Sequence, residues 1–327
     1  MNTTPSTEER VWAVLSHLSS LAFGMGILLP IIGWSDQRRK SNYSCFQSLQ
    51  ALGYQSLGFT IWILSYLIVF TTILIVLVVM SFQTEKTGKS FDPFFGPWAS
   101  ILFGVVFGFF AIYFLLPIIA AVACAFGKDF RYPVLGDRLA RYLEYNPAQR
   151  SDEQAWLNED HEFRWVAAMG HFSILIMIWG MLAPLTTWIL YGKRSLFLKF
   201  QSIQTLVYQA GTTILYFVGG FIYLFGLLLL IVGTGVTGEP NFNSSGGIFG
   251  ILVFGVSLLI SFLLLLVVPL LHILGQWAGY RVLKGDDYRY PLIGKLVERW
   301  IVNKTPPAGT ATRHLRDSSL SLKGESS

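Results

Sequence analysis

Two histidines lie in equivalent places inside long, uncharged segments of this chain. His17 and His171 each stand one to two helical turns within such a segment, where an ionisable side chain is a functional hypothesis by default. The simpler interpretation is a neutral imidazole that shares hydrogen bonds with a hydroxyl or a backbone carbonyl. We favour it because neither histidine has a carboxylate or a second histidine at ligand spacing, and we predict no metal site and no cofactor.

Glutamines and a tyrosine form a second polar pattern. Gln47, Gln50 and Tyr54 are spaced i, i+3 and i+7, which places them on one stripe of a helix, and Gln55 flanks that stripe. The same pattern occurs again at Gln201, Gln204, Tyr208 and Gln209. Amide side chains near lipid need hydrogen-bond partners, so both stripes should face the protein interior. They indicate either hydrogen bonds between helices, which we favour, or a polar path or ligand contact.

An Arg-Tyr-Pro sequence follows the last apolar segment of each half of the chain. It comprises Arg131 and Tyr132 in the first half, and Arg289 and Tyr290 in the second. Arginine and tyrosine suit the headgroup layer of a membrane, and proline stops a helix. We therefore predict that these residues are interfacial anchors. A sharper alternative is that the arginine binds a lipid phosphate.

No pattern typical of an enzyme accompanies these residues. The HExxH, GxSxG and GxxxxGK[ST] motifs are missing from the sequence, and no carboxylate pair lies in an apolar segment. The two cysteines, Cys45 and Cys124, form no CxxC pattern that would indicate a metal or redox site. The densest acidic stretch is predicted to be solvated and contains Asp152, Glu153, Glu159, Asp160 and Glu162. We predict that the protein is not an enzyme and has no catalytic residues.

The polar residues are carried by six segments that contain no Asp, Glu, Lys or Arg. The chain has 327 residues, of which 53% are apolar and 13% are charged, whereas about a quarter are charged in soluble domains. The six segments are Val11–Ser35, Ser41–Thr84, Trp98–Gly127, Trp165–Gly192, Phe200–Gly238 and Pro240–Tyr280. Each exceeds the roughly 20 residues that cross a membrane as a helix. The sequence therefore predicts an all-α, polytopic membrane protein whose partner is the lipid bilayer.

Charge and the N-terminal region support this prediction. The net charge of +5 comes from the connecting loops and the tail, as expected of residues that orient a protein in an anionic membrane. No basic face of a soluble domain indicates nucleic acid. Glu8 and Glu9 precede the first apolar segment, where a cleavable signal peptide carries positive charge. We predict that the first segment is retained.

The two halves of the chain are copies of one module. A shift of 154 residues superimposes His17 on His171 and Trp34 on Trp188. The same shift superimposes residues 46–50 (FQSLQ) on residues 200–204 (FQSIQ). Chance similarity of apolar residues would not align histidine, tryptophan and glutamine in one order. We predict a membrane repeat at 1–143, a polar linker at 144–162, a second membrane repeat at 163–304 and a disordered tail at 305–327.

Four motifs carry a family resemblance. In the first copy they are Trp12-Ala-x-Leu-Ser-His17, Pro30-x-x-x-Trp34, Phe46-Gln-x-x-Gln50 and Arg131-Tyr-Pro133. Their order resembles a widespread family of small bacterial membrane proteins of unknown function, which is distantly similar to the twenty-kilodalton Tic subunit of the chloroplast inner-envelope translocon. The resemblance covers residues 8–141 and 162–299. Most members have one copy, so the resemblance implies a fused dimer.

Basic residues in the loops predict the path through the membrane. If all six segments cross once, the two sides carry 15 and 9 basic residues. If the first segment of each module folds back, the sides carry 22 and 2, which fits the positive-inside rule far better. Gly24, Gly26 and Pro30 interrupt the first segment, and Gly180 and Pro184 interrupt its copy. We favour a hairpin over a single kinked helix in an inverted-repeat transporter.

Three functions compete on these observations. A membrane scaffold or assembly factor that packs against other membrane proteins or lipids is favoured, because apolar segments and Gly104-x-x-x-Gly108 suit helix packing. The alternative is a channel or transporter with a polar path between the two repeats, as the translocon resemblance implies. A lipid-modifying enzyme ranks last. The predicted location is the bacterial cytoplasmic (inner) membrane, with several passes and both termini in the cytoplasm.

Overall fold

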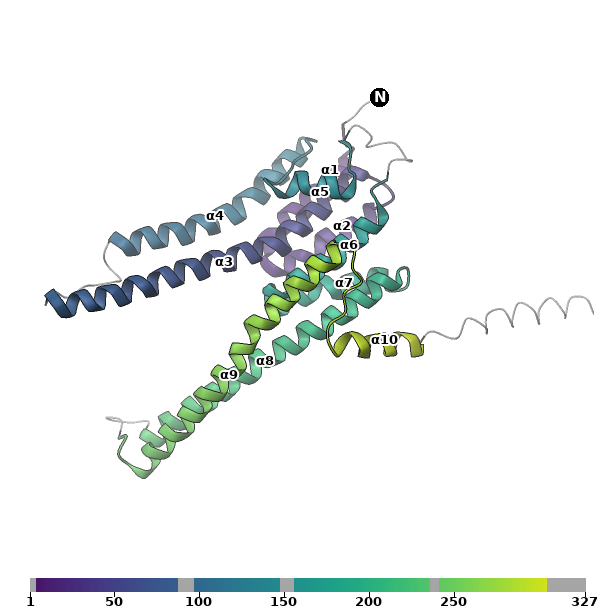
Figure 1. Cartoon of the computed structure of the whole chain (residues 1–327). Coiled ribbons are helices and arrows are strands. Elements are labelled where there is room, and N and C mark those ends of the chain that lie inside the picture. Colours follow the sequence, from purple (N-terminus) through teal and green to yellow (C-terminus); the bar gives the residue numbers. More distant parts are fainter. Residues whose placement is uncertain (1–3, 88–96, 148–155, 236–240, 305–327) are drawn as a thin grey trace, which may run out of the picture.

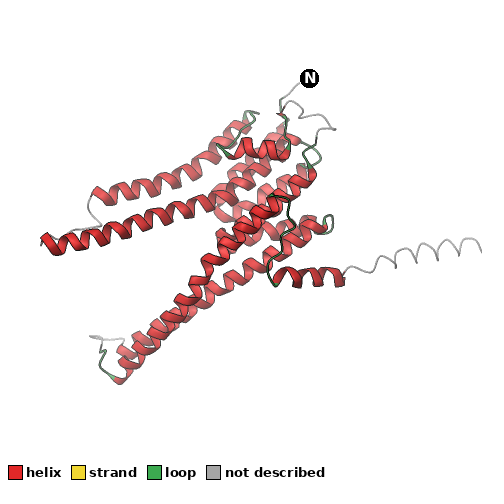
Figure 2. Cartoon of the chain, viewed as in Figure 1, coloured by secondary structure: helices red, strands yellow, loops and turns green. Residues whose placement is uncertain are grey.

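The computed structural model describes residues 4–87, 97–147, 156–235 and 241–304. Every regular element in these residues is a helix (Figure 2), as the sequence predicts. The first repeat contains α1 (Thr7–Leu18), η1 (Ser19–Ile27), α2 (Leu28–Gln37), α3 (Asn42–Thr87), α4 (Pro97–Ala125) and α5 (Leu135–Leu143). The second contains α6 (Glu159–Phe172), η3 (Ser173–Met181), α7 (Leu182–Tyr191), α8 (Leu196–Thr234), α9 (Ser245–Leu283) and α10 (Ile293–Lys304). Both repeats thus have the same order of elements.

The first segment of each repeat is a hairpin, which confirms the folded-back arrangement. Gln37 at the end of α2 donates a hydrogen bond to Glu8 at the start of α1 (3.4 Å). These residues would be about 44 Å apart in one continuous helix. Gly33 lies against Trp12 and Ser16, and in the second repeat Gly170 of α6 lies against Pro184 of α7. The two arms of each hairpin therefore run antiparallel, and both ends of the hairpin lie at the same end of the molecule.

The chain reverses at positions that the sequence did not indicate. Phe23 in η1 and Met177 in η3 occupy equivalent places, and both have a φ of 54°, in the left-handed region that ordinary residues avoid. Pro30 is the third residue of α2, where its missing N–H costs no helical hydrogen bond. The prolines therefore lie in the first turns of the returning helices, rather than at the break itself.

Gly26 and its equivalent Gly180 allow the two arms of each hairpin to approach. A Cβ atom on Gly26 would overlap the backbone carbonyl of Ser19, and one on Gly180 would overlap that of Ser173. Both overlaps are closer than the 3.0 Å that real Cβ atoms keep. These two glycines are therefore required by close contact between backbones.

Six segments of the described chain are long and apolar enough to cross a membrane, and two of them are the hairpins. The other four are α3, α4, α8 and α9. Figure 1 shows α3 with α4 and α8 with α9 as two long pairs, which extend from the hairpins and diverge toward their far ends. The N-terminus and α10 lie at the opposite end of the molecule (Figure 1), so both repeats have the same orientation.

The two long pairs differ in their packing. Gly226 of α8 lies directly against Ser257 of α9, and Gly233 lies against Gly246, so small side chains bring these helices close together. In α4, by contrast, a Cβ on Gly104 or Gly108 would meet no other atom of the described chain within 4 Å. The predicted packing role of Gly104-x-x-x-Gly108 therefore has no partner among the described residues.

The predicted linker at 144–162 contains the start of a helix. Helix α6 begins at Glu159, four residues before the predicted start of the second repeat. Asn158 caps it by accepting a hydrogen bond from the backbone N–H of His161 (3.3 Å). The middle of the predicted linker, residues 148–155, and the predicted tail at 305–327 lie outside the described residues.

Candidate functional site

His17 lies at the centre of a buried network that joins α1, α3 and the segment after α4. Its Nδ1 is 3.0 Å from the hydroxyl of Tyr132, and its Nε2 is 3.0 Å from Oε1 of Gln47. Gln47 Nε2 donates to the carboxylate of Asp129 (3.0 Å) and to the carbonyl of Phe130 (3.1 Å). The polar network of the first repeat therefore draws in a carboxylate that sequence analysis did not place there.

The partners of Gln47 assign the protonation of His17. Asp129 and the carbonyl of Phe130 only accept, so the amide nitrogen of Gln47 faces them and its oxygen faces the imidazole. Nε2 of His17 must then carry the hydrogen, and Nδ1 accepts from Tyr132. Burial raises the pKa of Tyr132 well above its usual value, so its hydroxyl stays a donor. Both ring nitrogens of His17 therefore have a hydrogen-bond partner.

Gln50 completes this network. Its Nε2 donates to Oε1 of Gln47 (3.1 Å) and to the carbonyl of Phe130 (3.0 Å), while its Oε1 accepts from the backbone N–H of Tyr132 (3.0 Å). Every polar atom of Gln47 and Gln50 thus has a partner within the repeat. The network holds the Asp129–Pro133 segment against α3, and it leaves no amide group free for a ligand.

Tyr54 and Gln55 lie beside this network and bond to other groups. The Tyr54 ring stacks on Tyr132 with centroids 4.1 Å apart, and its hydroxyl donates to the carbonyl of Tyr113 in α4 (2.9 Å). Gln55 Nε2 donates to Ser19 Oγ (2.9 Å) and to the carbonyl of Ser16 (3.4 Å). Gln55 therefore satisfies backbone that the hairpin leaves without helical partners.

The second repeat reproduces this arrangement. His171 lies 2.9 Å from the hydroxyl of Tyr290 and 3.1 Å from Oε1 of Gln201. Gln201 donates to Asp287 (2.9 Å), and Gln204 accepts from the backbone N–H of Tyr290 (3.2 Å). The remaining equivalents repeat their roles: Tyr208 stacks on Tyr290, and Gln209 donates to Ser173 Oγ and to the carbonyl of Gly170. Thr205, which also contacts His171, replaces Ala51 of the first repeat.

The two polar networks stay inside their own repeats. The hydrogen bonds of His17 join residues of the first repeat, and those of His171 join residues of the second. A polar path between the two repeats, as in the channel or transporter alternative, would need polar groups of both repeats at one place. The described residues instead bring each set together separately.

The Arg-Tyr pairs divide between two environments. Tyr132 and Tyr290 are buried, each with its hydroxyl on a histidine, rather than at the surface where a headgroup anchor lies. Arg131 is partly exposed and forms an ion pair with Asp137 of α5 (2.7 Å), and this hydrogen bond raises the pKa of Arg131. Arg289 is bonded in the same way to Glu298 (2.7 Å).

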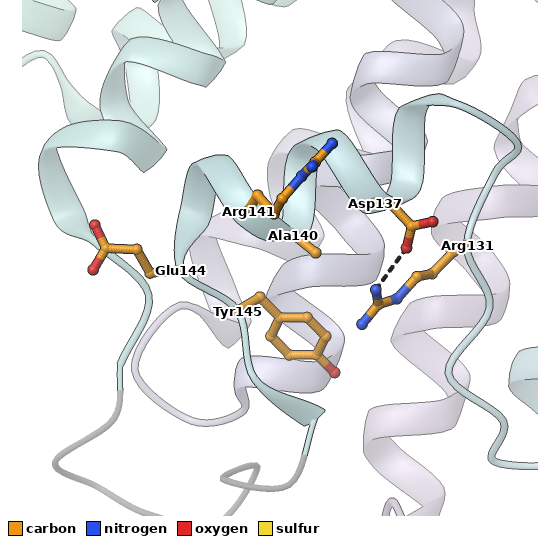
Figure 3. A pocket seen from close by; sticks show the side chains of 6 residues that line it. All are labelled: Arg131, Asp137, Ala140, Arg141, Glu144 and Tyr145. Atoms are coloured by element: carbon orange, nitrogen blue, oxygen red, sulfur yellow. Dashed lines mark hydrogen bonds and ion pairs between the residues drawn. The ribbon is translucent and has the colours of Figure 1, made fainter.

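A surface pocket lies beside Arg131 at the start of α5. Figure 3 shows its six lining residues, with the Arg131–Asp137 ion pair drawn as a dashed line. They are Arg131, Asp137, Ala140, Arg141, Glu144 and Tyr145. Two arginines and two carboxylates balance in charge, and Arg131 is already bonded to Asp137, so the pocket offers no simple phosphate site.

The contact between the repeats contains a buried ion pair that sequence analysis missed. Glu162 of α6, predicted to be solvated, is 1% exposed and lies 2.7 Å from Nε of Arg38. Glu162 also accepts from the indole N–H of Trp34 (2.9 Å), and Trp34 stacks on Tyr191 of α7. Burial opposes the charge on Arg38, but Glu162 and Glu159 outweigh it and raise the pKa of Arg38.

Within the described chain, no group of three or more His, Cys, Asp or Glu side chains could hold a metal ion. The model of one protein family matches the chain twice, over residues 8–139 and 162–297. The chain belongs to the magnetosome magnetite crystal formation protein family. Each match begins at the hairpin and ends within α5 or α10, so it includes one complete polar network.

The double match to this family agrees with the duplication seen in the sequence. No curated protein and no solved structure matches the chain.

Replacing Gln50 with leucine should destabilise the first repeat by about 1–3 kcal/mol, because it leaves the buried N–H of Tyr132 and the carbonyl of Phe130 short of a partner. Gln204→Leu should have a similar effect in the second repeat. Unfolding in mixed micelles of rising SDS content measures the loss. The control is Thr72→Val, which removes only an exposed bond to its own helix. A Gln50→Leu loss no larger than the control loss would contradict the structural role.

Proposed function

We propose that this protein is a non-enzymatic membrane scaffold or assembly factor, which serves magnetite crystal formation by packing against other membrane proteins or lipids. The observation that carries the proposal is the saturation of both polar networks within the repeats. The imidazoles of both histidines and the amides of Gln47, Gln50, Gln201 and Gln204 bond to groups of the protein itself. The outward faces of the long helices carry large apolar side chains, such as Phe107, Phe221 and Leu252. Such surfaces pack against lipid tails and other membrane helices.

The alternative is a channel or transporter with a polar path between the repeats, in line with the resemblance to the Tic subunit of the chloroplast translocon. Such a path needs polar groups that face one another across the repeats. The contact between the repeats is formed mainly by packed apolar and aromatic residues, such as Trp34 and Tyr191. Its polar pairs, Arg38 with Glu162 and Thr60 with Gln276, are bonded to each other. These contacts favour the scaffold, and the translocon resemblance remains a prediction.

A test of the scaffold needs two readouts. The tagged protein, extracted from a magnetite-forming host in mild detergent, should retain at least one other membrane protein that an unrelated tagged membrane protein does not. Deletion of the chain should change the size or number of the crystals. If no other membrane protein were retained and the crystals were unchanged, the proposal would be contradicted. Ion flux through proteoliposomes that contain the purified protein would support the channel instead.

The location that we propose is the bacterial inner membrane or a membrane derived from it, with both termini in the cytoplasm. This orientation is supported by the 22 basic residues on one side against 2 on the other. A cysteine at Asn243, an exposed residue before α9, should react with a membrane-impermeant maleimide in intact cells. A cysteine at the exposed Lys193, after α7, should react only after the cells are opened. The reverse pattern would show the opposite orientation.

A further inference from the structure

The two repeats meet through surfaces that are not equivalent. The second hairpin packs against α3 of the first repeat, where the ring of Trp165 lies on Gly53 and its indole N–H donates to the carbonyl of Leu49 (2.9 Å). In the described chain, the first hairpin makes no comparable contact with α8. The hairpins also touch each other, through α2 with α7 and η1 with η3. Because the first repeat adds its long helix α3 to this contact and the second does not add α8, the contact as a whole is heterologous, that is, head to tail.

The equivalent surfaces, on α1 of the first repeat and α8 of the second, are exposed. The 154-residue shift relates three buried residues of the second hairpin, Trp165, Met169 and Phe172, to Val11, Leu15 and Leu18 of α1. These three α1 residues are 50%, 41% and 36% exposed. They are spaced i, i+4 and i+7, so they form one apolar face.

The receiving surface is repeated on α8. Gly53, under Trp165, corresponds to Val207, which is 41% exposed. Leu57, which packs against the core between the repeats, corresponds to Gly211. A Cβ on Gly211 would meet no described atom within 4 Å. The α8 surface is therefore apolar and open where the α3 surface is covered.

The charged groups are repeated only in part: Arg38, which pairs with Glu162, corresponds to the uncharged Gly192, and Glu159 corresponds to Pro5, whereas neighbouring charges are kept. At the covered contact, Arg38 and Arg39 after α2 bond to Glu162 and Glu159 at the start of α6. The equivalent of Glu162 is the exposed Glu8.

The equivalents of Arg39 and Lys40 are the exposed Lys193 and Arg194 after α7. The acidic start of α1 and the basic loop after α7 are thus both exposed. Their charges are complementary, as at the contact already formed.

We propose that a second copy of this chain docks its first hairpin on α8, just as the second hairpin docks on α3 within one chain. Val11, Leu15 and Leu18 of the incoming copy would cover Val207 and Gly211, and Glu8 would lie at Gly192, beside the basic Lys193. Because both repeats have the same orientation, the copies associate side by side in the membrane. A head-to-tail contact of this kind builds a ring or a row of copies.

Cysteine cross-linking tests this contact. Val11→Cys and Val207→Cys stand at the equivalents of Trp165 and Gly53, in a chain whose Cys45 and Cys124 are replaced by alanine. Oxidation in membranes should link chains only when both new cysteines are present. The control pairs Val11→Cys with Phe221→Cys, 14 residues and about 21 Å further along α8, and should give no link.

Charge reversal provides a second measurement. Glu8→Lys should reduce the yield of cross-linked chains severalfold, and adding Lys193→Glu should restore it. A product from Val11→Cys alone would show a symmetric contact and overturn the proposal. Equal yields from the control pair would show non-specific encounters between chains, and no product at all would show that lipid covers both surfaces. Either outcome would also overturn the proposal. The readout is the size of the linked chain, so failure leaves the proposed role in crystal formation untouched.

Discussion

Replacing Gly26 with alanine is expected to prevent the first hairpin from closing. The new Cβ would overlap the backbone carbonyl of Ser19, and neither the carbonyl nor the tight turn at Phe23 can give way as a flexible side chain could. The free energy of unfolding should fall by on the order of 4 kcal/mol or more, since large losses arise from such forced backbone shifts. Unfolding in SDS-containing mixed micelles and the amount of protein in the membrane measure the effect.

Two further glycines sharpen this experiment. Gly180→Ala should have a comparable effect on the second hairpin, because its Cβ would overlap the carbonyl of Ser173. Gly104→Ala in α4 is the matched control, since a Cβ there would meet no described atom within 4 Å. It should be neutral or slightly stabilising, because alanine favours a helix over glycine by about 1 kcal/mol. If Gly26→Ala were no more harmful than Gly104→Ala, the close approach in η1 would be wrong.

Replacing Arg38 with methionine should separate the two repeats. Arg38 and Glu162 are both buried, and removal of the arginine leaves a carboxylate without its main partner. Breaking a buried pair in this way costs about 3–5 kcal/mol. The same unfolding measurement should therefore show a large loss, and the trypsin sensitivity of the segment between the repeats should increase.

The neighbouring arginine provides the control. Arg39 forms an ion pair with Glu159 that is half exposed on both sides, so Arg39→Met should cost less than about 1 kcal/mol. Adding Glu162→Leu to Arg38→Met should recover most of the loss, because the unpaired charge is then gone. Equal losses from Arg38→Met and Arg39→Met would mean that the buried pair does not hold the repeats together.

Several features of this protein were predictable from its residues alone. Membrane helices follow from the uncharged lengths of the chain, because lipid excludes unpaired charge and backbone. The duplication follows from polar residues such as His17 and His171 recurring at a constant shift. The folded-back hairpin follows from the loop charges, which obey the positive-inside rule in only one of the two arrangements. These signals are local or statistical, so they require no knowledge of contacts.

Tertiary structure alone decided which side chains meet. His17 and Tyr132 are 115 residues apart, and Arg38 and Glu162 are 124 apart, so no local spacing identifies them as partners. The burial of Glu162 could not be predicted from the sequence for the same reason. An acidic residue beside a polar linker is usually solvated.

The inequality of the two repeats was hidden as well. The 154-residue shift pairs similar residues of the two repeats. Only their packing shows that α6 covers α3 while α1 leaves α8 open. Sequence composition determines that a side chain is apolar and on which face of its helix it lies. Whether that face meets lipid, the other repeat or another copy depends on how the helices pack, because each of these environments accepts the same apolar residues.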